Sequence, residues 1–482
     1  MQSVSILEEH LDTTPLVVDL DGTLLRSDLL HETVFALLRR SPLQLFLLPW
    51  WWYQGKARLK HELARRVELD VTSLPYDEPF LDYLRRQKAE GRILILATAS
   101  NVALARRIAD HLDLFDAVVA SDEADNLKGE AKLAALRKRF GDGGFDYAGN
   151  EMSDMCLWRV ARRALLVGGG RSLAEAVDRE AVLEQHFRRP VPGLRTYLSA
   201  LRVHQWLKNL LVFIPLITAH RFLDVALLMD LVIAFFAFSL CASSVYVLND
   251  LTDLEDDRSH PRKCRRPFAS GELSIATGCV LIALLLAGAA GLALLLPTAF
   301  VLTLGVYYAT TLAYSLWLKR IEVLDVMALA FLYTIRIVGG GVAAGIPLTV
   351  WLLGFSLFVF LSLAVAKRCA ELVVMRELGR EAARGRCYRV SDLPLLFVLG
   401  VGAGYVASFI LVVYLTSRSV QEAYATPALL WVFCPMLLYW ITRIWLKTFR
   451  GEMHDDPVVF AARDTSSRVL AVIGGVAILF AI

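Results

Sequence analysis

From about Leu201 onward, the chain carries one apolar segment after another, each near the length that a membrane helix needs. In an α-helix, about 20 apolar residues cross the roughly 30 Å of hydrocarbon in a bilayer. The hydrophobic content of the whole chain, 56%, is also too high for a soluble protein of 482 residues. We therefore expect residues 191–482 to form an all-α transmembrane bundle.

Nine candidate spans can be marked in this region, and the first and the last of them are short. They cover residues 207–219, 224–247, 273–296, 298–318, 323–344, 350–366, 393–415, 426–446 and 467–482. The loops on one side of the bundle hold many Lys and Arg residues, whereas the opposite loops hold little beyond Arg221 and Arg418. Because positively charged loops remain in the cytoplasm, we expect an inner-membrane protein whose N-terminal domain and charged loops face the cytoplasm.

Residues 1–190 are charge-rich, with only short apolar runs, and Pro190, Pro192 and Gly193 mark a linker. The first residues carry acids and no apolar core, so we expect no cleaved signal peptide. The net charge of +3 does not indicate a nucleic-acid partner, and we expect none, because Lys and Arg gather beside the membrane segments. The seven Cys residues lack a C-x-x-C pair, which is typical of reduced thiols. The sequence predicts two domains, 1–190 and 191–482.

A dense block of charge follows the apolar run that begins near Phe222, at the point where the membrane should end. If the helix continues through this block, Asn249, Asp253 and Asp257 share one face, with Asp250 one step round. Carboxylates this close repel one another unless a cation lies among them, and their oxygens suit Mg²⁺ together with phosphate. We interpret the block as a Mg²⁺-diphosphate site at the membrane surface. The alternative is a solvated polar loop whose Asn and Asp residues cap a helix.

Three short apolar runs in the N-terminal domain each lead into polar residues. Such runs are typical of buried parallel strands, and open α/β sheets build their sites at the carboxyl ends of the strands. Helical stretches separate the runs, so we expect a doubly wound parallel sheet. In chain order, the residues of interest around this edge are Asp19, Asp21, Gly22 and Thr23; Thr98 and Ser100; Lys128, between the runs; and Asn150, Glu151, Ser153 and Asp154.

These pieces, and above all the sequence DLDGT after an apolar run, resemble the haloacid dehalogenase (HAD) superfamily of phosphatases across most of residues 14–170. The resemblance implies that Asp19 is the nucleophile, which forms an aspartyl-phosphate, and that Asp21 is the general acid/base. Thr98 would then hold the transferring phosphoryl group, and Lys128 would balance its charge.

The same resemblance implies a Mg²⁺ site made by Asp19, Asp21, Asn150 and Asp154. The superfamily usually has an acid where this chain has Asn150, so the metal site is either weaker or dependent on Glu151. This departure leaves open the alternative of a degenerate, regulatory or structural domain.

The connection between Asp21 and Thr98 is longer than a strand-helix unit needs, and the resemblance implies a helical cap at about residues 27–80. Within it, the apolar and aromatic residues 43–53 are too few to span a bilayer. With Lys56 and its basic neighbours, this run suits the water-lipid interface or a docking surface on the membrane domain. An ordinary cap core is an equal alternative.

The charged side of the bundle holds three further sequences: YSLWLKR at residues 314–320, AKRCAE at 366–371 and RGEMHDDPVVFAARD at 450–464. Together with the charged block, they resemble the UbiA family of membrane prenyltransferases across almost all of residues 195–482. The match is closer to one branch, the decaprenyl-phosphate phosphoribosyltransferases. Aromatic prenyltransferases carry a second Asp-rich motif where this chain has Lys367 and Arg368, and these cations suit an anionic phosphate.

This resemblance implies transfer of 5-phosphoribose from phosphoribosyl pyrophosphate to a polyprenyl phosphate. The residues that would hold Mg²⁺ on the leaving diphosphate are Asn249, Asp250, Asp253 and Asp257. The other candidate substrate-binding residues are Lys263 and Arg266, near the diphosphate; Lys319; Arg336, which shares an apolar helix with Asp325; Lys367, Arg368 and Glu371; and Asp455 and Asp456, as ribose or metal ligands or as helix caps.

The HAD-like domain would then remove the 5-phosphate from the lipid-linked product, and its tether raises the effective concentration of that product. Two other functions remain as alternatives. One is an aromatic prenyltransferase that uses a polyprenyl diphosphate, with a phosphatase domain of unrelated or regulatory role; Lys367 and Arg368 argue against it. The other is a lipid transporter or scaffold that binds headgroups without chemistry.

Overall fold

The computed structural model describes residues 14–123, 126–382, 387–453 and 457–482. The chain forms two compact units. The first unit comprises Met1–Leu201 together with Val247–Leu281, and the second comprises Arg202–Tyr246 together with Ile282–Ile482. The charged block after residue 247 therefore packs with the N-terminal unit, although in sequence it lies between membrane segments.

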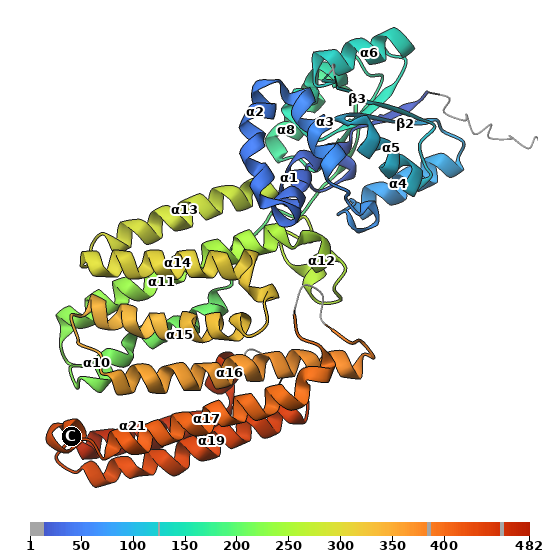
Figure 1. Cartoon of the computed structure of the whole chain (residues 1–482). Coiled ribbons are helices and arrows are strands. Elements are labelled where there is room, and N and C mark those ends of the chain that lie inside the picture. Colours follow the sequence, from blue (N-terminus) through green and yellow to red (C-terminus); the bar gives the residue numbers. More distant parts are fainter. Residues whose placement is uncertain (1–13, 124–125, 383–386, 454–456) are drawn as a thin grey trace, which may run out of the picture. The chain divides into compact units, whose positions relative to one another are not determined.

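The first unit is built on a six-stranded parallel sheet (Figure 1). Its strands are β1 (Leu16–Val18), β2 (Leu94–Asn101), β3 (Ala117–Ser121), β4 (Asp146–Gly149), β5 (Ala164–Val167) and β6 (Leu183–Phe187). The order β3-β2-β1-β4-β5-β6 places β1 between β2 and β4. This confirms the doubly wound sheet that the sequence predicts.

The carboxyl ends of the three central strands meet at one edge of the sheet. Val18 at the end of β1 pairs with Leu96 of β2 and with Ala148 of β4. The polar residues just beyond these positions therefore share that edge, and they are Asp19, Thr98 and Asn150.

Helices fill the connections between the strands. Those of the core are α4 (Glu78–Ala89), α5 (Val102–Leu112), α6 (Glu130–Phe140), α7 (Met155–Trp158) and α8 (Arg171–Glu180). Between β1 and β2, at the place predicted for a cap, the chain forms α1 (Leu29–Arg40), η2 (Pro42–Leu47), α2 (Leu48–Tyr53) and α3 (Lys56–Arg66). Leu37, Leu59 and Leu63 fill the interior of this insertion, because each is buried on the inner face of its helix.

Among the described residues, seven helices are long and apolar enough to cross a membrane. They are α11 (Val225–Thr252), α13 (Ile275–Ala293), α14 (Thr298–Leu316), α15 (Leu324–Ala343), α16 (Val350–Glu377), the span Val390–Leu415, most of which is α17 (Leu393–Leu415), and the span Pro427–Phe449, most of which is α19 (Phe433–Phe449). Shorter segments complete the described chain: η1 (Leu20–Leu24), η3 (Val71–Ser73), η4 (Met152–Asp154), α9 (Leu194–Ala200), α12 (Leu254–Arg258), η6 (Lys263–Arg265), η7 (Leu318–Arg320), η8 (Val390–Asp392), α18 (Arg418–Ala423), η9 (Pro427–Val432) and α20 (Pro457–Arg463).

The predicted count of nine spans is not confirmed. The expected first span, 207–219, is divided between η5 (Val203–Phe213) and the short helix α10 (Ile214–Thr218). Polar side chains of η5, those of Lys208 and Asn209, are buried. The segment therefore serves as part of the protein interior. The expected last span is α21 (Thr465–Ala481), an apolar helix that is shorter than the seven.

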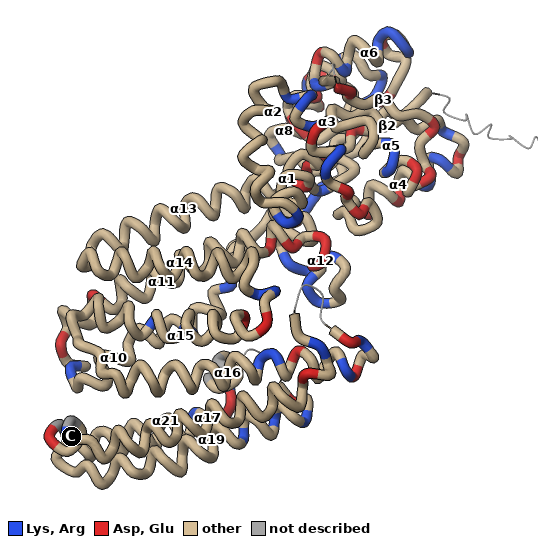
Figure 2. Tube along the Cα trace, in the orientation of Figure 1, with Lys and Arg blue, Asp and Glu red and all other residues tan. Residues whose placement is uncertain are grey.

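The long helices of the second unit carry little charge along their length, and Lys and Arg gather at the same end of α16 and α19 (Figure 2). One close approach inside this unit depends on glycine. A Cβ at Gly340 of α15 would overlap the carbonyl of Val212 in η5. Glycine at this position therefore lets the two segments pack backbone to backbone.

Candidate active sites

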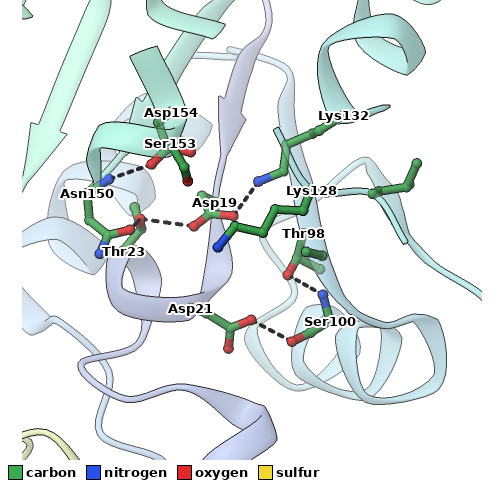
Figure 3. Close-up of polar contacts among 12 residues, drawn as sticks. Asp19, Asp21, Thr23, Thr98, Ser100, Lys128, Lys132, Asn150, Ser153 and Asp154 are labelled. Atoms are coloured by element: carbon green, nitrogen blue, oxygen red, sulfur yellow. Dashed lines mark hydrogen bonds and ion pairs between the residues drawn. The ribbon is translucent and has the colours of Figure 1, made fainter. Parts of the chain in front are cut away.

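Asp19 lies directly after β1, and the site of the first unit is arranged around it (Figure 3). The residue is 7% exposed. The chain turns sharply beyond it at Gly22, whose φ of +75° is a conformation that L side chains rarely adopt. A Cβ at Gly22 would also overlap the side-chain amide of Asn150. The glycine of DLDGT is thus required both by the backbone turn and by the space inside the site.

Lys132 is the cation that the structure places against Asp19. Its Nζ lies 2.6 Å from Oδ1 of Asp19 and 3.1 Å from the hydroxyl of Tyr147 (Figure 3). Burial disfavours the charged ammonium, but the nearby carboxylates, with Asp19 first among them, outweigh this effect and raise the pKa of Lys132. Sequence reasoning assigned the charge-balancing role to Lys128, whose side chain is 58% exposed and lies 3.2 Å from Glu151.

The two lysines are four residues apart, and Lys132 lies within α6, which begins at Glu130. The position of Lys132 could have been noticed as one helical turn beyond Lys128. Only the packing of α6 against the sheet shows which of them reaches the nucleophile. The role expected of Lys128 stays a prediction.

Asp21 is held by two donors from different parts of the chain. Its Oδ1 accepts a hydrogen bond of 2.8 Å from the backbone N–H of Leu29 at the start of α1, and its Oδ2 accepts one from the hydroxyl of Ser100. Burial, followed by the negative charge of Asp28, raises the pKa of Asp21 to about 7. A carboxyl group that titrates near neutral pH suits the general acid/base role.

Thr98 lies at the carboxyl end of β2 and is fully buried. Its hydroxyl oxygen accepts a hydrogen bond of 2.9 Å from the backbone N–H of Ser100. The same Ser100 donates to Asp21, so the last residues of β2 connect Thr98 with the second carboxylate (Figure 3). The site is therefore assembled from the ends of β1 and β2, as strand order requires.

Oxygen atoms that suit a hard cation converge near Thr23. Its hydroxyl lies 3.3 Å from Oδ2 of Asp19 and 3.1 Å from Oδ1 of Asn150. In the described part of the chain, no three His, Cys, Asp or Glu side chains form a group that could hold a metal by themselves. Mg²⁺ usually takes one or two protein oxygens and completes its shell with water and substrate phosphate. The carboxylate of Asp19 and the amide oxygen of Asn150 fit that pattern.

The side chain of Asp154 accepts hydrogen bonds from residues close to it in the sequence. Its Oδ2 accepts hydrogen bonds from the backbone N–H groups of Asn150 and Glu151, at 3.0 and 3.2 Å, and its Oδ1 accepts one of 2.9 Å from the Tyr147 hydroxyl. Burial, followed by the negative charge of Asp19, raises the pKa of Asp154 to about 6. The residue thus shapes the loop after β4 and adds negative potential next to the nucleophile.

The second candidate site begins at the charged end of α11. This helix ends at Thr252 and α12 begins at Leu254, so the helix is interrupted at Asp253. The backbone N–H of Asp253 still donates to the carbonyl of Asn249 at 2.9 Å, and that of Asp257 to the carbonyl of Asp253 at 2.8 Å. The four-residue spacing of the motif is therefore kept across the interruption.

Arg266 joins two carboxylates of this motif. Its Nη1 lies 3.1 Å from Oδ1 of Asp250 and 2.6 Å from Oδ2 of Asp257, and both Asp side chains are almost fully buried. Lys263 lies 3.8 Å from the other oxygen of Asp257. Burial raises the pKa of Asp257, although the charge of Arg266 opposes that shift. One guanidinium thus keeps two mutually repelling carboxylates together.

Arg336, in the second unit, is a buried cation among neutral groups. It donates to the amide oxygen of Asn209 at 2.7 Å, to the hydroxyl of Tyr307 at 2.8 Å and to the backbone carbonyl of Leu332. The ring of Tyr333 lies 5.7 Å from its guanidinium carbon, and the Nζ of Lys208 lies at the same distance from that ring. Sequence reasoning singled out Arg336 and missed these partners, which come from η5, from α14 and from its own helix α15.

Arg368 is neutralised by carboxylates. It donates to both oxygens of Asp325 and to both oxygens of Glu371, the latter at 2.7 Å, and it donates to the Tyr314 hydroxyl at 2.6 Å. Its side chain is 1% exposed. These contacts tie α14, α15 and α16 together. The predicted contact between Arg368 and a lipid phosphate stays a prediction, and in this structure its guanidinium is occupied by protein acids.

The remaining predicted residues are placed less specifically. Lys319 in η7 and Lys367 in α16 are half-buried. Glu371 contacts Arg368 as described above. Asp455 and Asp456 lie outside the described residues.

The chain thus combines a parallel-sheet domain, with a buried aspartate directly after β1, and seven described helices that are long and apolar enough to cross a membrane. A model of the UbiA prenyltransferase family matches residues 211–463, and a model of haloacid dehalogenase-like hydrolases matches residues 16–159. The chain belongs to the UbiA prenyltransferase family, and it carries a haloacid dehalogenase-like domain at its N-terminus. Both resemblances and their fusion in one chain are confirmed.

Three relatives describe this match further. Uncharacterized protein y4nM of Sinorhizobium fredii is 39% identical over 94% of this chain and 88% of its own length. Nodulation protein NoeC of Azorhizobium caulinodans is 38% identical over 57% of this chain and 89% of its own length. Decaprenyl-phosphate phosphoribosyltransferase of Mycolicibacterium smegmatis is 35% identical over 43% of this chain and 66% of its own length. The two matched domains indicate an enzyme, and part of the chain is related to a decaprenyl-phosphate phosphoribosyltransferase.

Proposed function

We propose that this chain is a bifunctional membrane enzyme that makes a polyprenyl-phosphoryl-ribose. The transferase part moves 5-phosphoribose from phosphoribosyl pyrophosphate to a polyprenyl phosphate, and the HAD-like domain removes the 5-phosphate. The observation that carries the proposal is the union, in one chain, of a phosphatase-type Asp19–Lys132 pair with a transferase part 35% identical to a decaprenyl-phosphate phosphoribosyltransferase.

In the transferase reaction, an oxygen of the lipid phosphate bonds to the anomeric carbon of the ribose, and the diphosphate leaves with the bonding electron pair. Asn249, Asp250 and Asp253, with Asp257, are the proposed ligands of Mg²⁺, which when bound stabilises the charge of the leaving diphosphate. Arg266, already poised between Asp250 and Asp257, would contribute positive charge to the same group. The buried cation Arg336 is the proposed partner of the lipid phosphate, because its protein partners are neutral.

In the phosphatase reaction, a carboxylate oxygen of Asp19 bonds to the phosphorus, and the bond from phosphorus to the ribose 5-oxygen breaks. Asp21 donates a proton to that oxygen as it leaves. Water then attacks the aspartyl-phosphate, Asp21 accepts its proton, and phosphate is released. Lys132 counters the charge of the nucleophile and of the transferring group, and Thr98 orients the group. Asp19, Asp21, the amide of Asn150 and Asp154 are the residues that would hold Mg²⁺ in this domain.

The proposal includes an orientation in the membrane. The charged ends of α16 and α19 coincide with the loops that hold most of the Lys and Arg (Figure 2). The positive-inside rule then supports an inner-membrane protein with both sites in the cytoplasm, where phosphoribosyl pyrophosphate would be the soluble donor.

The test is lipid analysis by mass spectrometry after purified protein is incubated with Mg²⁺, phosphoribosyl pyrophosphate and a polyprenyl phosphate. The intact protein should yield polyprenyl-phosphoryl-ribose. Asp19→Asn should accumulate the 5-phosphorylated lipid, and Asp250→Ala should yield no lipid product. Asp142→Asn, at an exposed acid outside both sites, is the matched control and should behave as the unsubstituted protein.

Two results would contradict the proposal. Dephosphorylated product from Asp19→Asn would show that the HAD-like domain does not carry the second step. The absence of diphosphate release with any donor would favour a scaffold or transporter.

A further inference from the structure

The cap carries an exposed apolar surface that neither proposed reaction uses. This surface, here called the cap patch, is the outer face of Pro42–Tyr53, which comprises η2 and α2. Its most exposed members are Leu43 (77%), Phe46 (82%), Trp50 (58%), Trp52 (54%) and Tyr53 (83%). Large apolar side chains gathered in this way on one segment mark an interaction surface.

The cap patch rests on an ordered support. Trp51, between the two exposed tryptophans, is 5% exposed and belongs to the core of the cap, with the guanidinium of Arg66 4.5 Å from its ring. Trp50 and Tyr53 stack with their ring centroids 6.1 Å apart. The two interpretations of this run, cap core and interface, therefore apply to opposite faces of the same helix.

Along the sequence, the charge that flanks the cap patch has one sign. The sequence contains no Asp or Glu between Glu32 and Glu62, and residues 41–55 carry no charge at all. The cations of this interval flank the apolar run on both sides: Arg39, Arg40, Lys56, Arg58 and Lys60. Arg39 pairs with Asp256, Arg58 with Glu62 and Glu123, and Lys60 donates to the carbonyl of Ala99, so Arg40 and Lys56 are the cations that form the rim of the patch. The Nζ of Lys56 lies 5.1 Å from the ring of Trp52, at the border of the patch. An aromatic surface with a rim of cations is complementary to an anionic lipid surface.

Helix α1, which leads into the cap patch, is bound to the loop that connects two membrane spans. Arg258 donates to both carboxylate oxygens of Glu32 at 2.6 and 3.1 Å, and the two side chains are 7% and 4% exposed. Arg39 pairs with Asp256 at 2.6 Å. Arg258 and Asp256 lie between α11 and α13, so this loop emerges at a membrane surface. These contacts, all within the first unit, hold the cap next to that surface.

We propose that the cap patch docks on the membrane that carries the chain, with its aromatic side chains among the lipid headgroups and its rim cations against anionic ones. The docked cap holds the phosphatase-type site at the height where a lipid-linked sugar leaves the bilayer. A substrate anchored by a polyprenyl tail then reaches Asp19 without leaving the membrane. The docking itself does not depend on which reaction the two sites carry out.

The experiment is photo-crosslinking of the full chain in lipid nanodiscs. Phe46 is replaced by p-benzoylphenylalanine, and a matched protein carries the same group at Val182, an exposed apolar position outside the patch. Mass spectrometry of the irradiated protein should show lipid adducts at position 46 about fivefold more abundant than at position 182. Equal yields at the two positions would overturn the proposal.

The same samples also show whether something other than lipid covers the cap patch. Crosslinks from position 46 to a second copy of the chain would assign the cap patch to an interface between copies, and crosslinks to the chain's own helices would assign it to an internal contact. Either result overturns the proposal. In nanodiscs with phosphatidylglycerol, the adduct yield should exceed that in purely zwitterionic nanodiscs, and Arg40→Gln with Lys56→Gln should remove the difference. An equal yield in both lipids would overturn the role of the rim cations.

Discussion

The Nζ atom of Lys132 lies 2.6 Å from Oδ1 of Asp19, and this pair is the electrostatic centre of the phosphatase-type site. The two residues are 113 positions apart in sequence. The ammonium is almost fully buried, so its charge acts on the carboxylate with little screening by solvent. The exposed Lys128, by contrast, is paired with Glu151 at the rim.

We expect Lys132→Met to lower the phosphatase kcat by about 100-fold or more, because the charge that stabilises the transferring phosphoryl group is lost. Lys128→Met should lower kcat less than about tenfold, since its side chain is largely in solvent. The measurement is phosphate release from the 5-phosphorylated lipid by the intact protein. If Lys128→Met proves the more damaging of the two, the roles given to these lysines are reversed.

The substitution Asn150→Asp tests the metal site of the first unit. In the unsubstituted protein, the Thr23 hydroxyl lies 3.1 Å from the amide oxygen of Asn150. The new carboxylate keeps an acceptor at that position and adds a negative charge beside Asp19. We expect the Mg²⁺ concentration for half-maximal phosphatase activity to fall on the order of tenfold. It is measured by titrating Mg²⁺ into protein treated with a chelator, with Ser153→Ala as a control nearby. An unchanged or higher requirement would place the metal away from residue 150.

Arg336 and Arg368 are both buried arginines of the membrane bundle, and they should respond differently to substitution. Because the partners of Arg336 are neutral, Arg336→Gln should raise KM for the polyprenyl phosphate about tenfold while the protein still folds. Arg336→Lys, which keeps the charge, should recover part of the loss. Transferase kinetics with the two variants provide the measurement, and an unchanged KM for the lipid would remove Arg336 from the binding site.

Arg368→Gln should act on stability instead. It leaves the buried carboxylate of Asp325 without its guanidinium, and breaking such a pair typically costs about 3–5 kcal/mol. The double substitution Arg368→Gln with Asp325→Asn removes both charges and should be more stable than Arg368→Gln alone. Thermal unfolding of the proteins in detergent measures this. A single variant as stable as the unsubstituted chain, with a raised KM for the lipid, would instead favour direct binding of the phosphate.

A large part of the architecture could be predicted from the sequence because it depends on residues that are close together in the chain. Apolar runs of membrane length became the seven long helices, and short β-branched runs that end in Asp, Thr or Asn became strands of the parallel sheet. The count of nine spans was not confirmed at 207–219, where the segment is divided between η5 and α10 and buries the polar pair Lys208 and Asn209. Those side chains contact other segments of the fold, and the hydrophobicity of consecutive residues carries no information about such contacts.

The sequence by itself therefore determined the two kinds of domain, the edge of the sheet at which Asp19 lies and the four-residue spacing of the acidic motif. These properties follow from hydrophobic length and backbone periodicity, which neighbouring residues define. Only the tertiary structure decided that Lys132 is the lysine that meets Asp19, that Arg266 joins Asp250 to Asp257, and that Asp325 neutralises Arg368 while Arg336 keeps neutral partners. Each of these contacts is made by packing between residues that are distant in the chain or on different elements, and a charge acts on whatever lies nearest in space, wherever it stands in the chain.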